Sequence, residues 1–153
     1  MPRTTMRASL ASAVVSGQRI IAWSWVTDVV FAATAVPYAL GVDAFEVPAV
    51  VIALVLFAIS MVVWPWVLAT AFVRSSQGDD VVVASLFFTV GNAPRDVRIQ
   101  LFAALGVSIV VAAATAAADP FGVLVPMLSL GLVGLWAARY GDFPPRPGDE
   151  TAR

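Results

Sequence analysis

Four long apolar stretches dominate the pattern of hydrophobic and polar positions along the chain. They cover residues 20–40, 48–73, 99–118 and 121–138, with short polar segments between them. About 20 helical residues cross the roughly 30 Å hydrocarbon core of a bilayer, and each stretch reaches or approaches this length. None alternates apolar and polar positions as a barrel strand does, and backbone groups inside a bilayer must pair internally. The pattern therefore predicts an all-α, integral membrane four-helix bundle.

Composition agrees with this interpretation and removes several classes of chemistry. Apolar residues make up 60% of the 153 residues and charged residues 12%, whereas soluble domains have about 45–50% and 25%. The chain has no Cys and no His, which excludes disulfides, thiolate or imidazole metal sites and histidine-based catalysis. Without lysine there is no phosphate-binding P-loop, and a net charge of −1 provides no basic patch for nucleic acid. We expect no enzyme, no cofactor and no metal, with membrane lipids as the surroundings.

The positions of the charged residues predict how the spans are oriented. All nine basic residues are arginines, and they lie before the first stretch, between the second and third, and after the fourth. The other two connections, 41–47 and 119–120, carry Asp43, Glu46 and Asp119 and no arginine. Basic residues concentrate on the cytoplasmic side of membrane proteins. Both termini and the loop at 74–98 are therefore expected in the cytoplasm.

The segments outside the spans suggest a three-part organisation. Residues 1–19 place Met6, Leu10, Ala13 and Val14 on one helical face, which predicts a short cytoplasmic amphipathic helix, with a frayed tail as the alternative. Residues 20–140 form the transmembrane domain. Residues 141–153 carry Pro144, with two further prolines close by, and are expected to form an extended cytoplasmic tail.

The loop between the second and third spans contains an unusual apolar segment at 81–90. It is too short to cross a membrane, so it could be an interfacial or re-entrant helix, or a strand docked on a partner. Asp79 or Asp80 could cap such a helix, and Pro94 is placed to begin the third span. Because an apolar decapeptide in water is prone to aggregate, a cytoplasmic interfacial position or a partner contact is expected. The candidate contact residues are Leu86, Phe87 and Phe88.

Asp28 is the only ionisable residue inside a span, and such residues are expensive in a bilayer and often functional. Ser60, Ser108 and Ser129 lie near the middle of the other three spans, so a polar layer around Asp28 is one hypothesis. The alternative is that each serine hydroxyl bonds back to its own helix. Asp28 would then be a neutral carboxyl group bonded within the bundle, for example to Ser24.

Small residues also recur at helical spacing in the third and fourth spans. Ala104, Ser108, Ala112 and Ala116 form a ridge, and Gly134 and Ala138 form a shorter one. Helices in lipid associate through close packing at such ridges. These residues are expected to form interior seams of the bundle or a contact with a partner.

Residue usage and the end of the chain carry a resemblance to known proteins. The lysine-free, Ala-, Val- and Arg-rich sequence is similar to those of actinobacteria with high genomic GC content. The runs DPFG at 119–122, GLWAARYG at 134–141 and FPPR at 143–146 resemble small actinobacterial membrane proteins. Some of these are accessory subunits, of the lipid uptake coordinator type, of mycobacterial Mce lipid importers. The resemblance implies a place in the bacterial inner membrane and a role in lipid transport, but it carries no site residue.

Two functions are compatible with these features. The first is a non-enzymatic accessory or stabilising subunit of a larger inner-membrane protein complex. The second is a small proton-coupled transporter that acts as a homo-oligomer through Asp28. The latter would resemble the small multidrug-resistance family in its four spans and its single acid in the first span, although here the acid is an aspartate.

Overall fold

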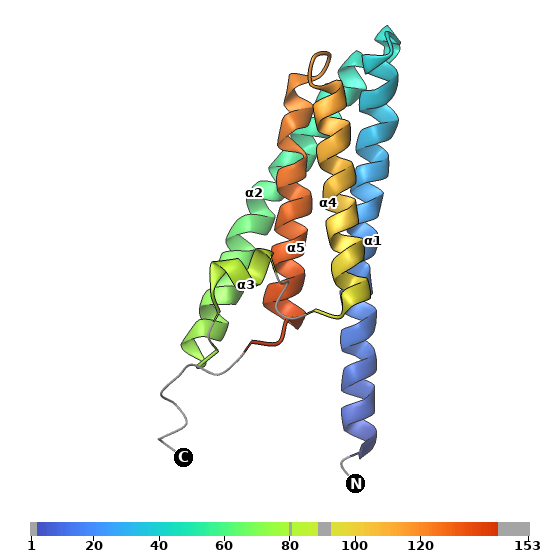
Figure 1. The fold of residues 1–153 in the computed structure, drawn as a ribbon. Helices are drawn as coiled ribbons and strands as arrows, with labels where there is room; N and C mark the ends of the chain where they lie inside the picture. The colour runs from blue at the N-terminus through green and yellow to red at the C-terminus, as the bar shows by residue number, and fades with distance from the viewer. Residues whose placement is uncertain (1–2, 80, 89–92, 144–153) are drawn as a thin grey trace.

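The long helices of the fold follow the apolar stretches of the sequence. The computed structural model describes residues 3–79, 81–88 and 93–143. In chain order its elements are α1 (Arg3–Ala39), η1 (Asp43–Phe45), α2 (Glu46–Ser76), α3 (Val83–Phe87), α4 (Arg95–Thr115), η2 (Pro120–Leu124) and α5 (Pro126–Tyr140). Four long helices run side by side, and the short α3 lies beside the lower parts of α2 and α5 (Figure 1). The prediction of an all-α fold is confirmed for the described residues.

Four segments of these helices are long and apolar enough to cross a membrane. They are Gly17–Ala39, Asp43–Ser76, Arg95–Thr115 and Pro120–Tyr140 in the described part of the chain. Each overlaps one predicted stretch, so the described part of the chain has four helices able to span a membrane, in the predicted order. The third begins earlier than expected because Pro94 is the N-cap of α4.

The first helix extends well beyond its apolar segment. Helical backbone runs without a break from Arg3 to Ala39, and the N-terminal part continues beyond the ends of the other long helices (Figure 1). Residues 3–19 are therefore helical and continuous with the first span. Their side chains before Gly17 lie outside the described residues, so the amphipathic face expected there stays a prediction.

α1 and α5 form the centre of the bundle. They contact each other, and both contact α2 and α4, which flank them. In the most apolar part of the segment Pro120–Tyr140, which comprises η2 and α5, 61% of the residues are buried, against 22–28% in the other three spans. The connections η1 and η2 lie at one end of the bundle, and the described chain begins and finishes at the other (Figure 1).

Small residues allow α5 to approach its neighbours closely. A Cβ atom added at Gly134 would lie 2.5 Å from Cε1 of Phe87 and 3.1 Å from Cγ1 of Val67. On α4, the ridge residues Ala104 and Ala112 are buried. The predicted ridges therefore face the interior of this chain's own bundle, which is how helices pack closely without a hydrophobic driving force between them.

The segment after α2 forms a helix rather than a strand where the structure describes it. Residues Val83–Phe87 make up α3, which begins after Val82 without a side-chain cap. Asp79, one of the two residues expected to cap such a helix, does not cap it, and its carboxylate pairs with Arg74 at 2.8 Å. Asp80 and residues 89–92 lie outside the described residues.

Candidate functional site

Asp28 lies at the middle of the first span and inside the bundle. Its side chain is only 2% exposed, and with Ser24, Phe31 and Ala35 it forms the buried face of α1 at intervals of three and four residues. Its Oδ1 accepts a hydrogen bond from Oγ of Ser129 on α5 at 3.3 Å. Ser108 on α4 lies beside the same carboxyl group. Three helices thus meet at the one acid expected from the sequence.

This cluster of Ser24, Asp28, Ser108 and Ser129, here called the Asp28 cluster, keeps unused hydrogen-bonding capacity. Oδ2 of Asp28 and Oγ of Ser24 and Ser108 are enclosed, and within the described residues they make no hydrogen bond. Most buried polar atoms in proteins have a partner. A carboxyl oxygen and two hydroxyl groups can bind a proton or exchange hydrogen bonds among themselves.

Ser60 behaves differently from the two serines that join Asp28. Its Oγ donates to the carbonyl oxygen of Phe57, one turn earlier in α2, at 2.6 Å. The expected alternative, a serine bonded to its own helix, therefore holds for Ser60. Of the three serines, Ser129 bonds to Asp28 and Ser108 lies beside it, so the functional polar layer around Asp28 stays a prediction.

Leu86, Phe87 and Phe88 do not form one outward surface. Leu86 is 3% exposed, and the ring of Phe87 stacks on Trp64 with centroids 5.4 Å apart. Phe88 is 78% exposed. The side chains of Leu86 and Phe87 pack within the chain. Of the three, only Phe88 is exposed enough to contact lipid or a partner.

Arg74 has a structural role that the sequence did not reveal. Its Nη1 donates to the carbonyl oxygens of Ala138 at 3.3 Å and Gly141 at 2.8 Å, and its guanidinium lies 4.9 Å from the ring centroid of Phe143. These contacts satisfy carbonyl groups at the C-terminal end of α5, which have no partner within the helix. Arg74 therefore ties α2 and the Asp79 turn to the end of α5.

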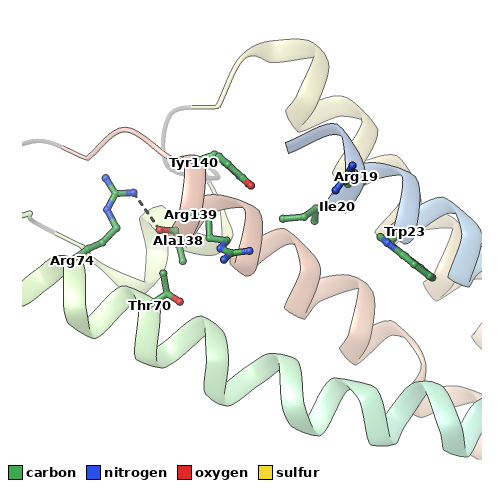
Figure 2. A pocket seen from close by; sticks show the side chains of 8 residues that line it. All are labelled: Arg19, Ile20, Trp23, Thr70, Arg74, Ala138, Arg139 and Tyr140. Carbon is green, nitrogen blue, oxygen red and sulfur yellow. Dashed lines mark hydrogen bonds between the residues drawn. The ribbon is translucent and has the colours of Figure 1, made fainter. Parts of the chain in front are cut away.

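A cavity of about 530 Å³ opens beside Arg74, at the end of the bundle where the described chain begins and finishes. Figure 2 shows the side chains that line it, which come from α1, α2 and α5. They are Arg19, Ile20, Trp23, Thr70, Arg74, Ala138, Arg139 and Tyr140. In the sequence these arginines indicated only membrane orientation. The sequence places arginines and aromatic residues near several span ends. This pattern does not predict that those ends line one cavity.

Asp119 is a second buried acid, which the sequence placed in the short connection between the third and fourth spans. It is fully buried, and its Oδ1 accepts from the backbone N–H of Phe121 at 3.2 Å as the cap of η2. An aspartate directly before a proline is a recognisable start signal for a helical turn. Asp119 therefore shapes the connection between α4 and α5.

Comparison of the chain with protein-family models, curated proteins and solved structures gives no match. The functional proposal therefore rests on the geometry of the Asp28 cluster and of the bundle surface.

Proposed function

We propose that this protein is a non-enzymatic accessory or stabilising subunit of a larger bacterial inner-membrane complex. The observation that carries the proposal is the position of Asp28. The one acid in the middle of a span is enclosed by its own bundle and bonded to Ser129 of the same chain. A carboxyl group in that place holds helices together, which favours a structural role over contact with a cargo or with a second copy of the chain.

We further propose that both termini and the α2–α4 connection are cytoplasmic. Arg19, Arg74 and Arg139 line a single cavity at one end of the bundle, whereas Asp43 and Asp119 belong to the connections at the other end. This separation of charge supports the positive-inside orientation.

The surface that fits a docking role lies around α3. Phe88 and Phe72 are the most exposed aromatic side chains of this region. An apolar groove between α2 and the segment from Val81 to α3 is lined by residues that include Leu68, Phe72, Val81 and Leu86. α3 lies toward the arginine end of the bundle (Figure 1), where a neighbouring subunit could cover this surface. The resemblance to accessory subunits of lipid importers suggests lipid transport as the activity of the complex.

Purification of the tagged protein from its native membrane in mild detergent, followed by mass spectrometry, tests the proposal. We expect subunits of an envelope lipid importer at fixed stoichiometry. Phe88→Ser at matched expression should recover less of them, because it removes an apolar contact without touching the bundle interior. A homodimer as the sole species would contradict the proposal.

The proton-coupled transporter remains the second candidate because of one observation. Oδ2 of Asp28 and the hydroxyls of Ser24 and Ser108 are enclosed without a hydrogen-bond partner in the described structure. Such a group can accept and release a proton. Isolation of a homodimer, with activity that disappears in Asp28→Asn, would favour this function.

A further inference from the structure

The cavity at the arginine end has a shape suited to an amphiphilic ligand. It is lined by α1 on one side and α2 on the other, with α5 between them (Figure 2). Its volume of about 530 Å³ lies within the range of about 300–1,000 Å³ that is typical of small-ligand sites. Ile20, Trp23 and Ala138 give it apolar walls beside the arginines.

The charge of the cavity is positive and only partly neutralised. Three arginines and no acidic residue line it. Arg74 pairs with Asp79 and is engaged at the end of α5. Neither Arg19 nor Arg139 has an ion-pair partner among residues 17–79, 81–88 and 93–143. Arg139 instead lies over the ring of Trp66, 5.5 Å from its centroid, which leaves its charge available.

The position of the cavity at the ends of the spans places its arginines at a membrane surface. Arg19, Arg74 and Arg139 each lie within two residues of the end of a span. Trp23 and Tyr140 line the same cavity, and both residue types favour the level of lipid headgroups. Trp23 is 63% exposed, so the apolar wall continues onto the outer surface of α1, where acyl chains lie.

We propose that this cavity binds the phosphate headgroup of an anionic phospholipid, with Arg19 and Arg139 as the two phosphate-binding residues. Guanidinium groups bind phosphate through paired charge-assisted hydrogen bonds. Basic pockets between spans at a membrane surface are known sites for anionic headgroups. Two available positive charges favour a lipid with net negative charge over a zwitterionic one. Arg74 is a positioning residue, because it holds the α5 end that carries Arg139. This site goes beyond the accessory role and does not depend on a partner complex.

Native mass spectrometry of delipidated protein in detergent, titrated with phosphatidylglycerol or phosphatidylcholine, tests the site. We expect phosphatidylglycerol to bind at least about tenfold more tightly, because each interfacial arginine contributes roughly fivefold. Arg19→Gln and Arg139→Gln should each weaken phosphatidylglycerol binding about fivefold, and together about 25-fold. The matched control is Arg98→Gln, which removes an exposed arginine at the same end of the bundle that does not line the cavity.

Three results would overturn the assignment. Equal binding of the two lipids would remove the charge preference. An equal loss in Arg98→Gln would show a general charge effect rather than a site. Displacement of phosphatidylglycerol by millimolar inorganic phosphate would identify a free-phosphate site. Arg19→Gln alone keeps the test decisive if the Arg139 variant fails to fold, because Arg19 is exposed and makes no hydrogen bond or ion pair to the described residues.

Discussion

At the scale of single residues, the Asp28 cluster shows what the sequence can and cannot indicate. Asp28 is conspicuous because it is the only charged residue in the four predicted apolar stretches. Ser129 was one of three serines that could join Asp28, but the sequence did not distinguish it from Ser60. In the structure Ser129 bonds to Asp28, whereas Ser60 bonds to its own helix. On α4, the ridge of small residues predicted the face that lies inside the bundle, and Ser108 lies on that buried face.

The first prediction concerns Asp28→Asn. The amide matches a neutral carboxyl group in shape and can both donate and accept hydrogen bonds, so the bond with Ser129 should persist. We expect the free energy of unfolding to change by less than about 1 kcal/mol, the net value of one hydrogen bond. Thermal unfolding in detergent measures stability, and complementation of a deletion strain measures function.

Two serine variants provide the control for this change. Ser129→Ala removes a bond between helices and should cost roughly 0.6 kcal/mol, the mean for such bonds in a membrane protein. Ser60→Ala removes only a bond to its own helix and should be nearly neutral. Loss of function in Asp28→Asn, with assembly intact, would contradict the structural role and support proton coupling.

At the scale of elements, α3 differs most from a simple interpretation of its sequence. Three consecutive valines at 81–83 left a strand possible, yet Val83–Phe87 is helical. Tertiary packing explains this choice, because one helical turn directs Leu86 inward and Phe87 onto Trp64 and the gap at Gly134. β-Propensity is context-dependent and yields to such contacts. The gap at Gly134 becomes visible only when α3 and α5 are side by side.

The second prediction compares Phe87→Ala with Phe88→Ala in this element. Phe87 fills the space over Gly134 and stacks on Trp64. Its truncation should destabilise the fold by about 2–4 kcal/mol, which is less than the roughly 3–5 kcal/mol of a fully buried phenylalanine because Phe87 is only partly buried. Phe88 is exposed, and its truncation should change stability by less than about 0.5 kcal/mol. Thermal unfolding of both variants in the same detergent decides this. Equal destabilisation would show that Phe88 also packs within the chain.

At the scale of the whole molecule, the number and order of the spans follow directly from hydropathy, but their arrangement does not. The interior position of α5 depends on Gly131, Gly134 and neighbouring small residues being covered on several sides. Such residues occur in both α4 and α5, so sequence alone does not rank the helices by burial. The meeting of three arginines around one cavity likewise depends on this arrangement rather than on any local motif.

The last prediction concerns how the whole bundle sits in the membrane. Reporters of cytoplasmic or external location, fused at the N-terminus, at Gln77 after α2 and at the C-terminus, should all report the cytoplasm, and a reporter at Ala44 in η1 should report the outside. The physical reason is that all the arginines of the described bundle lie outside the α1–α2 and α4–α5 connections, which carry acidic residues, and arginine is retained on the cytoplasmic side. Matched fusions that replace Arg95 and Arg98 with Gln should keep this topology, because Arg19, Arg74 and Arg139 remain. An external signal from Gln77 would overturn the four-span orientation, and with it the cytoplasmic position of α3.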